Sequence, residues 1–138
     1  MTISIITPSV RPAMLEIVGR CLRRQTCQDF EWIIVAPENL AVPIDRVIGH
    51  DDVYHFVAEP PKREGDYYRL NGAWNKAFDR AQGELLISIQ DGLWFPPHIV
   101  EMFLHHYQTH PKALVGAVGH QYDQIECGKP EHRVWSDP

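Results

Sequence analysis

One carboxylate in this chain stands where an ion or a phosphate could be bound. Asp91 follows the apolar run 85–89, which predicts a buried strand, and Gly92 comes directly after it. The carboxyl end of a central strand is where open α/β sheets place their ligand crevice. A carboxylate at that position could hold Mg²⁺ or Mn²⁺ against a diphosphate. The alternative is that Asp91 and Gly92 only form a turn, as these residue types commonly do.

Two other predicted strands, 3–6 and 30–35, also end in loops that carry polar residues. Because the carboxyl ends of parallel strands lie at the same edge of a sheet, we expect these loops to converge on one crevice. The residues that this places together are Thr7, Pro8, Ser9, Glu38, Gln90 and Asp91. The chain has no phosphate-binding P-loop, no dinucleotide-binding glycine motif and no nucleophile elbow, so none of those sites is predicted.

Strand and helix patterns alternate along the chain. Apolar residues at helical spacing predict three helices, which run from Pro12 to Gln25, from after Asp66 to Gly83, and from Pro97 to Lys112. Weaker signals predict a helical turn at 45–48 and strands at 53–57 and 114–118, followed by an irregular tail over 120–138. Strand, helix and parallel strand form a right-handed crossover unit. The sequence therefore predicts one three-layer α/β/α domain, Rossmann-like, over residues 1–138, with a mostly parallel sheet.

Composition limits the classes of function. A chain of 138 residues is long enough to bury a core as one domain. The formal net charge of −5 argues against a nucleic-acid backbone as partner. No apolar run approaches the roughly 18 residues that a membrane-spanning helix needs. Three cysteines without metal-binding spacing indicate reduced thiols, and with no visible secretory signal we expect a cytoplasmic protein.

Four segments, in order, resemble the nucleotide-sugar-binding half of family 2 glycosyltransferases, which have the GT-A fold. Residues 3–9 look like the opening strand and substrate loop of that family. Residues 22–35 match its L-x-x-Q-T-x-x-x-F-E stretch, and residues 71–84 match its asparagine-bearing helix with the A-x-G-E exit. Asp91 then falls in its D-x-D region, followed by an aromatic residue and a proline. The resemblance covers residues 3–118.

The resemblance implies that a nucleoside-diphosphate sugar, most simply a UDP-sugar, lies across the strand ends. It also implies that Asp91 holds Mg²⁺ or Mn²⁺ on the diphosphate, and that the sugar passes to an acceptor hydroxyl. Thr7, Pro8, Ser9 and Glu38 would contact the nucleoside. The other residues expected at the donor are Gln90, Arg69 near the diphosphate, Asn75, and Trp94, which could stack on a sugar or base. Arg69 is equally consistent with a surface position, and Asn75 with a bond to backbone.

The chain departs from the family pattern at three points. The aspartate pair that usually follows the second strand is reduced to Glu38, and the D-x-D is reduced to Asp91. Family members continue into a second half with the catalytic base, for which Asp123 and Glu126 are weak candidates here. The alternative is therefore a non-catalytic GT-A-like binding module or an inactive fragment; an unrelated flavodoxin-like domain is a third interpretation. Slow hydrolysis of a donor would separate an enzyme from a module.

His106 and His110 have the i, i+4 spacing at which a helix can present two zinc ligands. A solvated helix face explains the same pattern without a metal.

Overall fold

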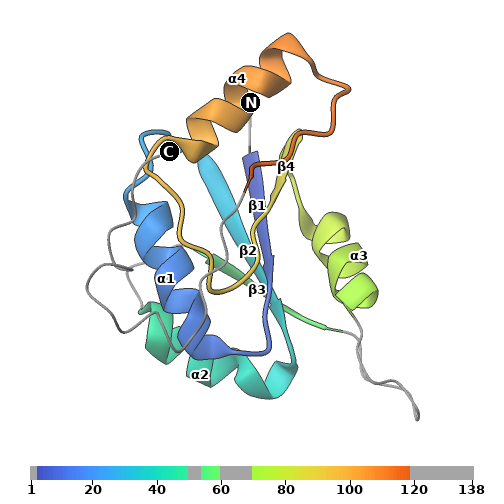
Figure 1. Ribbon diagram of the computed structural model, residues 1–138. Coiled ribbons are helices and arrows are strands. Elements are labelled where there is room, and N and C mark those ends of the chain that lie inside the picture. The colour runs from blue at the N-terminus through green and yellow to red at the C-terminus, as the bar shows by residue number, and fades with distance from the viewer. Residues whose placement is uncertain (1–2, 50–53, 60–69, 119–138) are drawn as a thin grey trace.

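The computed structural model describes residues 3–49, 54–59 and 70–118, and within them lies one parallel sheet of four strands. The strands are β1 (Ile3–Pro8), β2 (Phe30–Ala36), β3 (Tyr54–Ala58) and β4 (Leu85–Ser88). Their order across the sheet is β3-β2-β1-β4, so the first strand of the chain is central (Figure 1). Apolar residues fill β1 and β2, as expected for strands that are buried on both faces.

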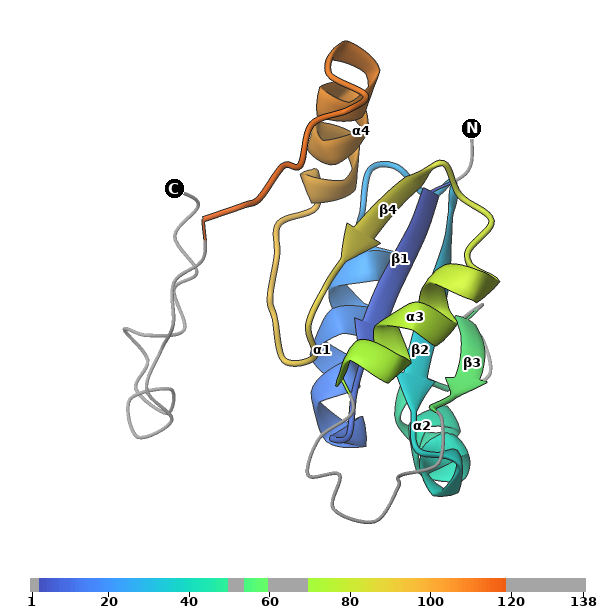
Figure 2. The same cartoon turned by 90° about the vertical axis from the view of Figure 1, so that its right-hand side faces the viewer.

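Helices cover both faces of this sheet. The helical elements are α1 (Pro12–Arg23), the 3₁₀ turn η1 (Glu38–Leu40), α2 (Ala41–Ile48), α3 (Leu70–Arg80) and α4 (Ile99–Thr109). Figure 2 shows α3 in front of the sheet and α1 behind it. The predicted three-layer α/β/α architecture is thus confirmed. Of the helices described, none combines the length and apolarity needed to cross a membrane.

The core consists of two clusters separated by the sheet. On the face covered by α1, α2 and α4, buried side chains such as Ile5, Leu15 and Ile34 pack together. On the other face, Ile6 and Ile33 pack against the small residues of α3, which are Ala73 and Ala77. Alternation along β1 explains the division, because neighbouring residues of a strand point to opposite faces.

Most predicted elements are present with shifted ends, and one strand prediction is wrong. Residues 114–118 form no strand; they are exposed, Leu114 and Val118 almost completely. A short apolar run becomes a strand only when a neighbouring strand supplies hydrogen bonds, and in the described part of the chain β4 is paired only with β1. On α3, the Phe78 side chain stacks on Trp74 and is half exposed.

Hydrogen bonds of the Gln25 side chain connect the end of α1 to the segment that leads from β4 into α4. Its buried side-chain amide donates to the carbonyl oxygens of Cys21 and Pro96, at 3.1 and 2.8 Å. Its Oε1 accepts a hydrogen bond from the backbone N–H of Val100 at 3.1 Å. Gln25 is therefore a structural residue that fixes the path of the chain after β4.

A second polar network joins the start of β1 to β2 and to the turn before β4. The Ser4 hydroxyl donates to Glu31 and accepts from the Gly83 N–H at 2.8 Å, while the Gln82 N–H donates to Glu31 at 2.7 Å. Burial by itself raises the pKa of Glu31, but these hydrogen bonds, with the charges of His55 and Arg80, outweigh it. The pKa of Glu31 therefore lies below its ordinary value in the folded protein.

Replacing Gln25 by leucine should lower the free energy of unfolding by about 2–4 kcal/mol, because it leaves the Val100 N–H and the Pro96 carbonyl without their partner. Urea denaturation followed by circular dichroism measures the change. Gln108→Leu, at an exposed position of α4, is the matched control and should change stability by less than about 0.5 kcal/mol. Equal effects of the two substitutions would contradict the role given to Gln25.

The stabilisation that Glu31 provides should depend on pH. Because its folded pKa is lowered, this stabilisation is complete above the unfolded value of 4.5 and is lost as the pH falls through the lower folded value. The difference in unfolding free energy between the wild-type protein and Glu31→Gln should therefore be constant near pH 7 and shrink below about pH 4.5. Denaturant titrations across this range test it. A difference that does not change with pH would refute the assignment.

Candidate functional site

The carboxyl ends of the parallel strands form one edge of the sheet, where β1, β2 and β4 each pass into a loop (Figure 1). Ser9 follows β1, Glu38 opens η1 after β2, and Asp91 follows β4. The loops at this edge thus come from three distant parts of the chain, as the sequence predicted.

Ser9 and Asp91 are in direct contact at this edge. The Ser9 hydroxyl donates a hydrogen bond of 2.7 Å to Oδ2 of Asp91, across 82 positions of sequence. Pairing of β1 with β4 sets this contact, since Ile6 lies opposite Ser88 and the Ile89 N–H donates to the Ile6 carbonyl. Ser9 is almost fully buried. The position of Ser9 is therefore determined by the pairing of the strands.

Arg11 completes the cluster. Its Nη2 lies 2.5 Å from Oδ1 of Asp91 and its Nε lies 3.3 Å from Oδ2. The guanidinium therefore contacts both carboxylate oxygens, each through a different nitrogen. The Arg11 backbone N–H also donates to the Ser9 hydroxyl at 3.0 Å. The Asp91 side chain is 9% exposed and that of Arg11 is 58% exposed. The cation is thus on the solvent side of a nearly buried carboxylate.

Sequence reasoning did not identify Arg11 as a site residue, although one signal was present. Arg11 occupies the N-cap position of α1, immediately before Pro12. The N-terminus of a helix carries partial positive charge, so a cation there is unfavourable unless an anion accompanies it. An arginine at that position indicates an acidic partner or ligand nearby, and Asp91 is that partner.

Asp91 also belongs to a turn, as one of the two interpretations of the Asp91–Gly92 pair predicted. Gly92 has a φ of 75°, a conformation that residues with a side chain adopt at a cost. Its N–H donates to the Met14 carbonyl at 3.2 Å, which holds the turn against the first turn of α1. The turn therefore presents Asp91 to Arg11 and Ser9.

The remaining predicted site residues differ in how far they are buried. Thr7 is fully buried, and its hydroxyl accepts a 3.0 Å hydrogen bond from the Trp32 indole. Pro8 is half-buried at the end of β1, and Glu38 and Gln90 are exposed in the loops at the edge. Arg69 lies outside the described residues.

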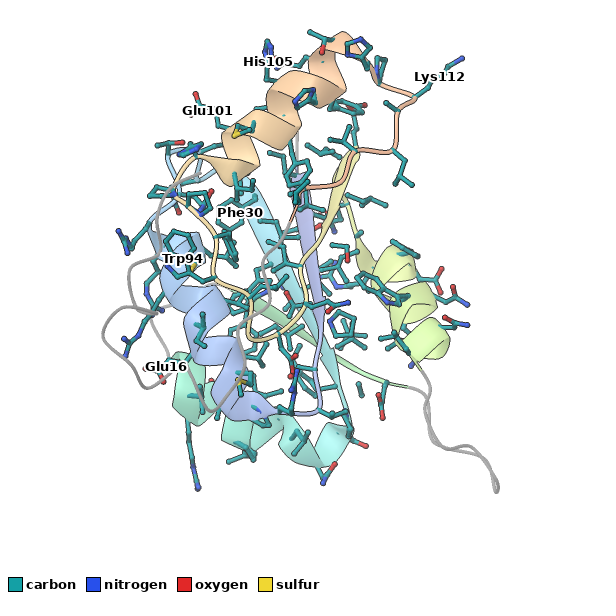
Figure 3. All side chains as sticks on the ribbon, viewed as in Figure 1. Glu16, Phe30, Trp94, Glu101, His105 and Lys112 are labelled. Carbon is teal, nitrogen blue, oxygen red and sulfur yellow. The ribbon has the colours of Figure 1, made fainter. Side chains whose placement is uncertain are left out.

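Trp94 and Asn75 are the two remaining candidates for contacts with a donor. Figure 3 places Trp94 alongside α1, on the segment that runs from the contact with Met14 back toward Gln25. Asn75 is exposed on α3 instead of lying on its apolar face. A stacking role for Trp94 and a donor-binding role for Asn75 stay predictions.

The arrangement of Asp91 does not fit a resident divalent metal. Its two oxygens accept hydrogen bonds from Arg11 and Ser9, and a metal ligated by them would have to displace the guanidinium. Throughout residues 3–49, 54–59 and 70–118, no three His, Cys, Asp or Glu side chains are grouped so that they could hold a metal ion. His106 and His110 lie exposed toward the end of α4 and join no such group.

No protein-family model matches this sequence, and no curated protein matches it. Among solved structures, TarS of S. aureus matches with a TM-score of 0.59 and 16% identity, over 90% of this chain and 23% of that one. TarS residues 1–349 in complex with UDP-GlcNAc gives a TM-score of 0.61 at 15% identity, over 94% of this chain and 39% of that chain. The same protein in complex with UDP gives 0.60 at 15% identity, over 94% and 40%.

This chain therefore spans less than half of the TarS chains that it matches. Identities near 15% establish similarity of fold and nothing more detailed. The fold established in this way is an α/β fold similar to that of the matched part of TarS, and membership of family 2 stays a prediction.

Proposed function

We propose that this chain binds a nucleoside-diphosphate sugar, most simply a UDP-sugar, across the carboxyl edge of its sheet, and that it serves as the donor-binding part of a glycosyltransferase. The observation that carries the proposal is the contact of Ser9 with Asp91, which gathers polar groups at the edge where such folds bind ligands. The similarity to TarS supports it, because TarS was solved with UDP-GlcNAc and with UDP.

Transfer of the sugar breaks the bond between its anomeric carbon and the diphosphate oxygen, and a new bond forms to an acceptor oxygen that loses its proton. The departing UDP gains negative charge. Hydrogen-bond donors of the protein that are already oriented toward that charge lower the activation barrier, because they need not reorganise during the reaction. In this proposal Pro8, Ser9 and Glu38 lie near the nucleoside and Gln90 lies near the diphosphate. Thr7 supports them from the core, where its hydroxyl is bound by Trp32.

The second candidate function is a binding module without transferase activity. The acidic residues at the ends of the described strands are Glu38, Glu59, which follows β3, and Asp91, and Asp91 is already ion-paired with Arg11. A general base must accept a proton from the acceptor, and an ion-paired carboxylate is poorly suited to that task. A module would bind the nucleotide at the same edge and leave the sugar in place.

UDP should bind the wild-type protein, and Ser9→Ala should weaken that binding about tenfold, because the hydroxyl holds both Asp91 and the Arg11 backbone. Isothermal titration calorimetry measures both affinities. Ser88→Ala removes an exposed hydroxyl from β4 and is the matched control, which should bind as the wild type does. An affinity unchanged by Ser9→Ala would exclude this edge as the donor site.

The two functions are separated by incubating the protein with UDP-GlcNAc and no acceptor. Release of UDP above the rate of a protein-free sample, reduced in Ser9→Ala, supports the transferase. Binding of UDP-GlcNAc without any release supports the module. Neither binding nor release would reject both.

A further inference from the structure

β4 is the outermost strand on one side of the sheet, and within the part of the chain that the structure describes it is paired only with β1 (Figure 2). The Ile89 N–H, at the exit of β4, donates to the Ile6 carbonyl of β1. Alternate residues of a strand bond to the same neighbour, so the backbone N–H and C=O groups of Leu86 and Ser88 point away from β1. β4 therefore offers backbone donors and acceptors to a further strand.

The sequence of β4 contains none of the features that usually prevent such pairing. Edge strands of soluble proteins commonly carry a lysine, a proline or a bulge, which keeps other chains from adding to them. The four residues Leu85–Ser88 include no charge and no proline. They pair with residues 3–6 of β1 in an unbroken register, so the strand has no bulge. The outer edge of β4 is thus suited to strand addition.

One face of β4 also exposes an apolar side chain. Leu86 lies opposite Ser4 of β1, on the side of the sheet where α3 packs, whereas Ile87 belongs to the core cluster on the other side. Figure 2 shows α3 in front of β1 and β2 but not in front of β4. Leu86 is 45% exposed, and Phe78 on α3 is 48% exposed. A partner at β4 can therefore bury apolar surface as well as pair with backbone groups.

Charge indicates which partner fits this edge. The formal net charge is −5, so two copies of the chain repel one another unless they meet at an uncharged surface. A two-fold axis brings the same residues of both copies together, and like charges that face each other on neighbouring strands are destabilising. The side chains of β4 are all uncharged, so two β4 strands can approach without that repulsion. A second copy of this chain therefore matches the edge.

We propose that two copies of this chain associate through β4, antiparallel around a two-fold axis, so that their two four-stranded sheets become one continuous sheet. In this arrangement the two carboxyl edges lie on opposite sides of the joined sheet, and each copy keeps its own candidate site. Dimerisation does not depend on the nucleotide binding proposed above, so either can fail while the other holds.

Sedimentation velocity of the full chain over roughly 1–300 µM, where weak complexes dissociate, measures the association. We expect a monomer–dimer equilibrium, because a short edge buries less area than the interface of a permanent dimer. Leu86→Lys and Ser88→Lys should each weaken dimerisation about tenfold, since the axis doubles every added charge. Both positions are exposed, and circular dichroism verifies that each variant is folded. Val42→Lys, at a 60% exposed position of α2, is the matched control and should dimerise as the wild type does.

A charge swap distinguishes pairing of β4 with β4 from other contacts. Leu86→Lys and Leu86→Glu should each associate weakly with themselves, but an equimolar mixture should form mixed dimers more tightly, because opposite charges then meet at the axis. Fluorescence-detected sedimentation with one variant labelled measures this. A wild type that stays monomeric, a dimer that Leu86→Lys leaves unchanged, or a mixture no tighter than its components would each overturn the proposal.

Discussion

Parallel pairing of β1 with β4 is the constraint on which the sheet edge depends. The register in which Ile3 lies opposite Leu85 and Ile6 opposite Ser88 brings Ser9 and Asp91 into contact at the exit of these strands. A shift of one residue would turn Asp91 to the other face of the sheet, because side chains alternate along a strand. The chemistry of the site is therefore a consequence of how the central strand pairs.

The chain is held in place both before and after β4. A Cβ atom on Gly83 would lie 2.5 Å from the backbone nitrogen of Ser4, so only glycine allows α3 to end this close to β1. After β4 the chain is held twice on α1, by the Gly92 N–H at Met14 and by the amide of Gln25. Asp91 lies between β4 and the first of these contacts. Its carboxylate is thus positioned by backbone contacts that involve no ligand.

Much of the architecture follows from the sequence, because apolar runs and helical spacing depend on local residues. The strands at 3–6, 30–35 and 85–89 and the polar residues that follow them were predictable in this way. The Arg11–Asp91 pair was not, since the partners are 80 positions apart and their contact requires the tertiary pairing of β1 with β4. The strand prediction for residues 114–118 was wrong for the opposite reason. Their composition suits a strand, but composition does not supply a neighbouring strand with which to pair.

Two acidic residues at opposite ends of the central strands show how similar contacts lead to different roles. Glu31, near the start of β1, accepts hydrogen bonds from Ser4 and the Gln82 backbone and lies near His55, so its carboxylate is occupied within the fold. Asp91, at the far end, is equally well bound, yet its main partner is an arginine that is more than half exposed. The first network joins β1 and β2 to the turn before β4, so its contribution is to the stability of the protein. The second lies at the edge where ligands of this fold class bind, which is the physical basis for proposing binding at that end of the sheet.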